Sequence, residues 1–153
     1  MFKRILLALD GSENAERALP WVKAYAGRDK ALVVLVRIVD NGVPLEEGAV
    51  DRWLAEARLY LQGPERELNF AGIPSKIVVD FGLPAELIVA VARREKADLV
   101  VMASRGGSKV ARWLLGGTVE RVLRLSPVPV LVARSGTPHA RQARVRRVLF
   151  PFD

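Results

Sequence analysis

The stretch that decides the fold is KRILLALDGS, residues 3–12. Five apolar residues, Ile5 to Leu9, follow one another between a basic pair and the dipeptide Asp10-Gly11. A short uninterrupted apolar run of this kind is typical of a strand that is buried on both faces of a parallel sheet. Ser12 is a suitable helix N-cap, so the stretch predicts a strand that passes directly into a helix.

The segment after Ser12 has the spacing of a helix with one buried face. Its apolar residues recur every three or four positions: Ala15, Ala18, Leu19, Val22 and Ala26. Pro20 lies inside this pattern and lacks a backbone N–H, so we expect it to kink or restart the helix.

The rest of residues 1–134 alternates between strand-like and helix-like segments. Apolar, largely β-branched runs predict strands at residues 32–39, 75–79, 99–102 and 128–133. A long helix is expected after Pro44, with its apolar side formed by Trp53, Leu54, Ala57 and Leu61. We expect this helix to be interrupted at Gly63-Pro64.

Two further helices are predicted in the second half of this region. Pro84 suits the first position of a helix, and the AELIVAVARRE segment that follows is apolar on most faces, which favours a well-buried helix. Residues 118–126 form the second, with Val119, Val122 and Leu123 facing inward.

This alternation predicts an α/β fold: an open five-stranded parallel sheet with helices on both faces, which is Rossmann-like. The 153 residues suffice for one such domain. Ligands of these folds bind at the carboxyl ends of the strands, where the winding reverses. The candidate positions are therefore Asp10, residues 38–40 and residues 103–107.

The loop between the fourth strand and the last helix carries two groups of glycines. Gly106 and Gly107 follow the strand, and Gly116-Gly117-Thr118 precede the helix. Backbone amides, the helix dipole and the Thr118 hydroxyl can together hold a phosphate chain, with Arg105, Lys109 or Arg112 adding positive charge. The alternative interpretation is that these glycines only form tight turns.

Residues 2–134 resemble the universal stress proteins of the UspA type. The resemblance is carried, in order, by RILLALDGSENAERAL, PAELIVAVARREKADLVVMASRG and WLLGGTVERVLRLSPVPVLV. It implies an adenine nucleotide alpha hydrolase-like fold. Members that bind ATP have Gly, two residues, Gly, nine residues, Gly and then Ser or Thr. Here Ala103 replaces the first glycine, Gly106 and Gly116 match, and Gly117 stands in the Ser/Thr position, with Thr118 next.

The resemblance implies roles for individual residues in binding ATP, together with Mg²⁺ held largely by phosphate oxygens. Asp10 would contact the ribose, and Ala8 and Ile38 would line the adenine pocket. Gly106, Gly116, Gly117 and Thr118 would hold the phosphates; Met102, Ala103 and Arg105 complete the predicted site. Two structural alternatives stay open: Asp10 as a helix cap beside Ser12, and Ile38 and Met102 as ordinary core residues.

The sequence offers little to an enzyme. Cysteine is absent, the one histidine, His139, lies in a Gly- and Pro-containing basic stretch, and no phosphate-loop, HExxH or G-x-S-x-G motif occurs. We expect at most slow ATP hydrolysis with no assigned base. The favoured function is a nucleotide-binding regulatory or sensor protein. The alternative is a nucleotide-free interaction module that acts through dimerisation.

The net charge of +7 is concentrated near the end of the chain. Five arginines and no acidic residue lie in residues 134–147. The rest of the chain therefore has 19 basic and 17 acidic side chains and is nearly neutral. We interpret residues 135–145 as a basic linker. Nucleic-acid binding through it is the weaker alternative, because aromatic residues for base stacking are missing from it.

The chain ends with RRVLFPFD, residues 146–153, which repeats the pattern of KRILLALD. We expect these residues to open a second universal stress domain of a tandem protein; an additional edge strand is the alternative. The strand at residues 128–133 is expected at a sheet edge and, by the resemblance, to pair in a homodimer. No signal-peptide or membrane-spanning pattern is visible near the start, and a cytoplasmic location is expected.

Overall fold

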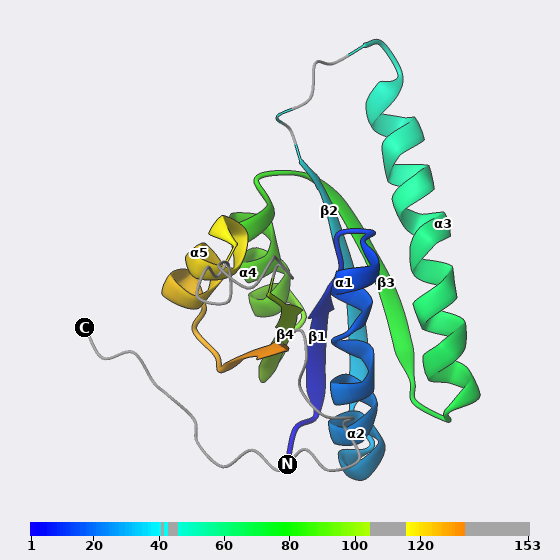
Figure 1. Ribbon diagram of the computed structural model, residues 1–153, viewed down its shortest axis with the longest axis vertical. Coiled ribbons are helices and arrows are strands. Elements are labelled where there is room, and N and C mark those ends of the chain that lie inside the picture. The colour runs from blue at the N-terminus through cyan, green and yellow to red at the C-terminus, as the bar shows by residue number, and fades with distance from the viewer. Residues whose placement is uncertain (41, 43–45, 105–115, 134–153) are drawn as a thin grey trace.

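The computed structural model describes residues 1–40, 42, 46–104 and 116–133. Strands and helices alternate along the described chain (Figure 1). The strands are β1 (Arg4–Ala8), β2 (Leu32–Asp40), β3 (Ser75–Gly82), β4 (Leu99–Ala103) and β5 (Val130–Ala133). The helices are α1 (Glu13–Glu16), α2 (Leu19–Asp29), α3 (Ala49–Phe70), α4 (Pro84–Arg94) and α5 (Gly117–Leu125).

The five strands form one parallel sheet in the order β3-β2-β1-β4-β5. The chain winds outward from β1 to β3 and then crosses back to β4 on the other side of β1. The winding therefore reverses between β1 and β4, and the predicted open parallel α/β fold is confirmed. A ligand cleft is expected beside the carboxyl ends of these two strands.

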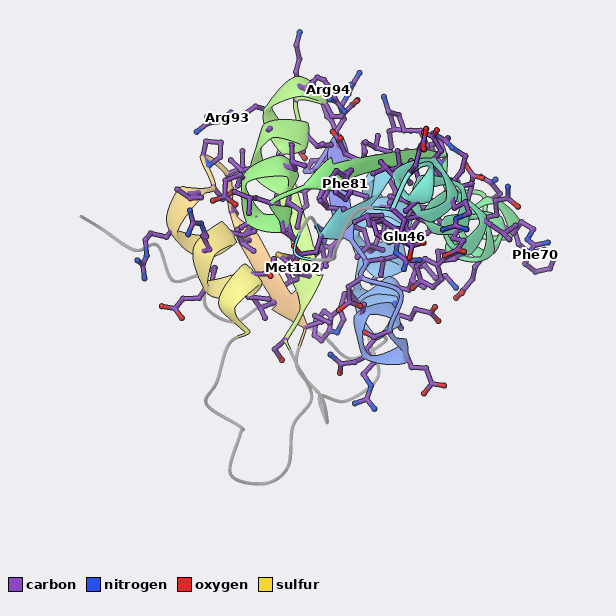
Figure 2. The ribbon with its side chains drawn as sticks, turned by 90° about the horizontal axis from the view of Figure 1, so that it is seen from above. Glu46, Phe70, Phe81, Arg93, Arg94 and Met102 are labelled. Carbon is purple, nitrogen blue, oxygen red and sulfur yellow. The ribbon has the colours of Figure 1, made fainter. Side chains whose placement is uncertain are left out.

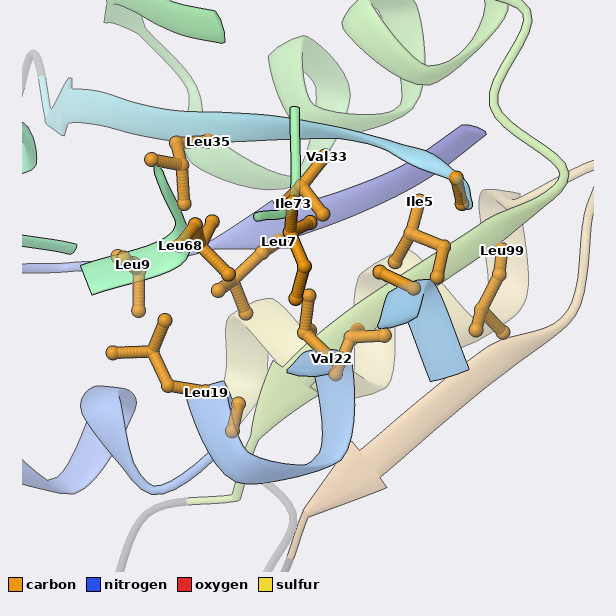
Figure 3. Packing of buried hydrophobic residues seen from close by; sticks show 14 of the residues in the cluster. Ile5, Leu7, Leu9, Leu19, Val22, Val33, Leu35, Leu68, Ile73 and Leu99 are labelled. Atoms are coloured by element: carbon orange, nitrogen blue, oxygen red, sulfur yellow. The ribbon is translucent and has the colours of Figure 1, made fainter. Parts of the chain in front are cut away.

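Successive residues of β1 face opposite sides of the sheet and are buried on both. Ile5 and Leu7 pack with α1, α2 and α3, whereas Leu6 and Ala8 pack with α4 and α5. In Figure 3, Leu19 and Val22 of α2 point toward the β1 side chains. None of these β1 residues exposes more than 8% of its surface, which explains the uninterrupted apolar run in the sequence.

The helix after β1 begins and restarts where the sequence indicates. The Ser12 side chain accepts a hydrogen bond from the Ala15 N–H, which confirms it as the N-cap of α1. The four-residue α1 ends at Glu16, and α2 starts at Leu19 with Pro20 in its first turn. Pro20 thus restarts the helix at a position where its missing N–H costs little.

The predicted interruption at Gly63-Pro64 is wrong, because α3 continues through Pro64 to Phe70. Pro64 is buried on the same side of the helix as Leu61 and Leu68, against the sheet. Packing of this face offsets the backbone hydrogen bond that proline removes, as tertiary contacts commonly do for long helices.

Several strand limits differ from the predicted ones. β2 continues to Asp40, so residues 38–40 lie within the strand instead of after it, where Ile38 to Asp40 pair with Asp80 to Gly82 of β3. β5 begins at Val130, two residues later than predicted, although the Pro129 carbonyl already accepts a bond from the Val100 N–H. Pairing partners, which a local pattern does not contain, set both limits.

Candidate functional site

A cleft of about 540 Å³ opens at the carboxyl ends of β1, β2 and β4, the edge at which the fold places a ligand. It is bounded by these strand ends and by the first turns of α4 and α5. Its lining residues are Ala8, Leu9, Asp10, Ala15, Val36, Ile38, Asp40, Pro84, Ile88, Met102, Ala103, Gly116, Gly117, Thr118 and Val119.

One wall of the cleft is apolar and firmly packed. Ala8, Val36 and Met102 expose no more than 8% of their surface, while Ile38 is half-buried beside them. Met102 lies near the centre of the molecule in the view of Figure 2. These side chains belong to the core beneath α4 and α5 and face the cleft with the same surface, so the core role and the lining role are compatible.

Asp10 is an exposed carboxylate at the entrance of the cleft. Its Oδ1 accepts hydrogen bonds from the Ser12 N–H at 2.9 Å and the Ser12 hydroxyl at 2.6 Å. Ser12, and not Asp10, accepts the capping bond from the Ala15 N–H. Asp10 therefore orients the capping residue, and among the described residues no group donates to its Oδ2.

The first turn of α5 supplies backbone donors to the opposite side of the cleft. Gly116 is the N-cap, with φ −52°, and it provides no side-chain cap. The first helical bond runs from the Glu120 N–H to the Gly116 carbonyl, so the Gly117, Thr118 and Val119 amides have no intrahelical acceptor. A helix start of this kind presents such amides to an anion. Gly117 and Thr118 are exposed, and a side chain added at Gly117 would meet no atom within 4 Å.

Ala103 closes β4 and lines the cleft without needing the left-handed backbone region. The non-glycine residues with positive φ in the described chain are Lys30 and Lys96, so Ala103 carries its methyl group in ordinary extended backbone. The next residue, Ser104, is buried and donates its N–H to the Ala133 carbonyl. A substitution of glycine by alanine at this position is therefore sterically permitted by the backbone.

Asn14 fixes the end of β4 to the start of α1. Its side-chain amide donates to the Ser104 carbonyl at 2.6 Å, across 90 residues of sequence. This contact is not predictable from the sequence, because a polar residue in the first helical turn carries no local sign of a distant partner. Val36, Pro84 and Ile88 line the cleft without having been predicted, although the rule that strand ends form the site pointed to their neighbours.

The Arg37 guanidinium packs close to the turn at Asp10-Gly11. The Arg37 guanidinium lies over the Tyr60 ring at 4.9 Å, and a Cβ atom at Gly11 would approach that guanidinium to 2.9 Å. Gly11 has φ +89°, a left-handed backbone conformation that favours glycine there. The Tyr60 hydroxyl donates a hydrogen bond to the Glu16 carboxylate at 2.9 Å. The pKa of Tyr60 is raised mainly because the hydroxyl is buried, and secondly because of this hydrogen bond.

The structure brings most of the predicted site residues together. Of the residues named from the sequence, those that line the cleft are Ala8, Asp10, Ile38, Met102, Ala103, Gly116, Gly117 and Thr118. Arg105 and Gly106 lie outside the described residues, as do Gly107, Lys109, Arg112, His139 and the predicted linker and second-domain start.

The described residues contain neither a metal-binding cluster nor a helix suited to spanning a membrane. Within residues 1–40, 42, 46–104 and 116–133, no three histidine, cysteine or acidic side chains converge as a metal site. In the same part of the chain, none of the helices combines the length and the apolar composition that crossing a membrane requires.

Comparisons with known proteins agree on one family. The model of the universal stress protein family matches residues 1–134. The chain is 36% identical to a Thermus aquaticus universal stress protein over 140 residues, which cover 88% of this chain and all of the relative. It is 30% identical to the universal stress protein MJ0577 of Methanocaldococcus jannaschii, with 88% and 96% of the two chains covered.

Solved structures give the same result for the fold. A structure of the protein MJ0577 aligns with a TM-score of 0.74 at 32% identity and covers 90% of this chain and 99% of its own. A universal stress protein in complex with cAMP aligns with a TM-score of 0.67 at 22% identity, over 86% and 96% of the chains, and shares the fold.

Proposed function

Since the chain belongs to the universal stress protein family, we propose that it binds ATP with Mg²⁺ in the cleft above β1 and β4 and acts as a nucleotide-dependent regulatory protein. One observation carries the proposal: the cleft joins an apolar wall, a carboxylate and a helix N-terminus. These are the three surfaces that a base, a ribose and a phosphate chain require. Its volume of about 540 Å³ suits a ligand of this size.

Each part of the nucleotide has a chemically matched surface. The adenine lies against the buried side chains Ala8, Val36 and Met102 and the half-buried Ile38, which form the apolar wall. Asp10 accepts hydrogen bonds from the ribose hydroxyls through the oxygen that Ser12 does not use. The phosphates bind at the N-terminus of α5, where the amides and the helix dipole favour negative charge.

The two departures from the ATP-binding pattern are compatible with this assignment. Ala103 adds a methyl group without backbone strain. Gly117 lacks the usual hydroxyl, but Thr118 provides one in the same first turn. The Mg²⁺ ion would be held by phosphate oxygens and water, because the protein residues described near α5 offer no carboxylate cluster.

One solved relative supports the choice of an adenine nucleotide. The universal stress protein that was crystallised with cAMP has the same fold and holds an adenine nucleotide. We propose a sensor role because no catalytic motif is recognised in the sequence. We therefore assign no hydrolytic base.

Isothermal titration calorimetry with Mg-ATP tests the proposal. The wild type is expected to bind one ATP per chain, and mass spectrometry of the purified protein should detect a retained adenine nucleotide. Asp10→Asn keeps the acceptor for Ser12 but removes the charge, and should weaken binding by about tenfold.

Glu13→Gln is the matched control for Asp10→Asn. It removes the charge of a neighbouring exposed carboxylate in the first turn of α1, but Glu13 does not line the cleft, so ATP affinity should stay unchanged. If the wild type released no heat with ATP up to about 1 mM, the proposal would be wrong and the nucleotide-free interaction module would take its place.

We further propose that the chain forms a homodimer through β5. This strand lies at the edge of the sheet, with β4 as its one described neighbour, and Val130, Leu131 and Val132 are only half-buried. The Pro129 and Ala133 carbonyls bond to β4, so by the period of two the Val130 and Val132 backbone groups point to the free edge. An apolar edge of this kind needs a partner strand.

Light scattering tests the dimer with a single substitution. Val132→Pro removes a backbone donor from the free edge and leaves the β4 ladder intact, so it should convert a dimer into a folded monomer. Val79→Thr, on the opposite edge strand β3 and half-buried like Val132, is a control far from β5. A wild type that is monomeric at high concentration would contradict the dimer.

A further inference from the structure

A second, smaller cleft continues the main one along the first turns of α4 and α5. It measures about 330 Å³ and shares Pro84, Gly117 and Thr118 with the main cleft. Its other lining residues include Glu86 of α4 and Arg121 of α5, which form an ion pair across it. A ligand that passes over the start of α5 would therefore enter a space bounded by these two charged side chains.

Arg121 is the one cation that lines either cleft in the described part of the chain. The charged residues of the main cleft are Asp10 and Asp40, both acidic. A nucleotide with three phosphates carries several negative charges, and the amides of α5 offer only partial compensation. Among the described residues, full positive charge comes to this ligand path from Arg121 alone.

The helix geometry places this guanidinium over the phosphate end of the site. Side chains of a helix lean toward its N-terminus, so a residue at position 121 covers the turn that contains Gly117 and Thr118. The same direction explains how Arg121 reaches Glu86 on the neighbouring helix.

The ion pair can be exchanged at little cost. The Arg121 side chain is 63% exposed, and an ion pair at such a position contributes little to stability. Glu86 lies in the first turn of α4, where the helix dipole favours a negative charge even without a cationic partner. A bidentate bond to phosphate would be stronger than the one that Arg121 gives up.

We infer that Arg121 determines specificity for the length of the phosphate chain: with ATP bound, its guanidinium leaves Glu86 and binds the outer phosphates in the smaller cleft. AMP ends before this cleft, so its affinity does not depend on the exchange. The inference rests on the proposed nucleotide site and adds a selectivity to it. Glu86 acts as a competitor that holds Arg121 when no triphosphate is present.

Calorimetric titrations with Mg-ATP and with AMP test this assignment. Arg121→Gln should weaken ATP binding by about tenfold and leave the affinity for AMP unchanged. Glu86→Gln frees the arginine and should strengthen ATP binding by about threefold, again without an effect on AMP. Arg124→Gln is the matched control, because Arg124 lies on the same helix, pairs with Glu120 at 3.1 Å and lines neither cleft.

The pattern of results separates this inference from the proposed function. Equal losses for ATP and AMP in Arg121→Gln, or no loss for either, would overturn the role of Arg121 and leave the nucleotide site standing. A wild type that binds neither nucleotide would overturn both. Circular dichroism melting of each variant excludes a folding defect as the cause of lost binding.

Discussion

The sheet has an amino edge, where its strands begin, and a carboxyl edge, where they end. The polar groups at these two edges differ in their hydrogen bonding. At the amino edge, where the strands begin, the Asp98 carboxylate accepts the Lys3 N–H at 2.7 Å and the Arg4 N–H at 3.2 Å. The Arg4 guanidinium donates to the Glu95 carbonyl at 2.9 Å, and Lys76 pairs with the Glu95 carboxylate at 2.6 Å. These charged groups connect β1, β3 and the end of α4.

At the carboxyl edge, polar groups surround a cleft instead of one another. Asp10 and Asp40 accept bonds only within their own turns, from Ser12 and Gly42, among the described residues. The α5 N-terminus has no side-chain cap. Satisfied groups hold a structure together, whereas groups left with spare capacity are available to a ligand. We therefore assign stability to the amino edge and ligand binding to the carboxyl edge.

The largest expected effect is on stability at the amino edge. Asp98→Ala removes the acceptor of two backbone N–H groups and should lower the free energy of unfolding by about 2–3 kcal/mol. ATP affinity should not change, because Asp98 lies at the opposite end of β4 from the cleft. Urea denaturation and calorimetry measure the two quantities. A variant that lost affinity but kept its stability would reverse the comparison.

A substitution at the carboxyl edge should affect ATP binding more than stability. Ile38→Gln places an amide in the apolar wall and should weaken ATP binding by about tenfold, which corresponds to ~1.4 kcal/mol. Because Ile38 is only half-buried, the unfolding free energy should fall by less than about 1 kcal/mol. The same two measurements apply. Unchanged affinity would remove Ile38 from the site.

The amino edge should also give the protein an acid-sensitive contribution. The hydrogen bond from Lys76 lowers the pKa of Glu95 from its ordinary value of 4.5. The resulting stabilisation is complete above that value and is lost as the pH falls through the lower pKa of the folded protein. Glu95→Gln should therefore be less stable than the wild type by about 1 kcal/mol at neutral pH, and the difference should shrink below pH 4.5.

Unfolding curves recorded between pH 3 and pH 7 test this pH dependence. A gap between wild type and Glu95→Gln that stayed constant over this range would show that the Lys76 contact does not depend on the Glu95 charge. Nucleotide affinity serves as the control and should be the same for both proteins at neutral pH.

The smallest expected effect is a gain of affinity. Gly117→Ser restores the hydroxyl that the ATP-binding pattern has at this position, and the added Cβ meets no atom within 4 Å. One further hydrogen bond to phosphate should strengthen ATP binding by about threefold. Gly27→Ser, at a helix position that is equally open but far from the cleft, is the control. Weaker ATP binding by Gly117→Ser would place the phosphates elsewhere.

The parts of the fold that the sequence predicts correctly are those governed by local chemistry. The buried strand, predicted at Ile5 to Leu9 and observed at Arg4–Ala8, and the Ser12 cap follow from an apolar run and a capping residue, which act over a few positions. The continuous α3 does not, because the packing that compensates Pro64 comes from β2 and β3. The limits of β2 likewise depend on a partner strand distant in sequence.

The site was predictable to the extent that it follows from topology. Asp10, Ile38 and Ala103 were identified because strand ends must meet at one edge of a parallel sheet, and they line one cleft. Asn14 and Arg121 were not identified as parts of this edge, since their roles depend on distances between elements. Such contacts become visible only once the helices are placed on the sheet.

Hydrogen exchange with and without Mg-ATP tests the difference between the two edges most directly. At short exchange times, which report local fluctuations, ATP should slow the amides of residues 9–14 and 116–121 and leave those of residues 94–99 unchanged. Equal protection at both edges, or protection confined to residues 94–99, would contradict the assignment of binding to the carboxyl edge.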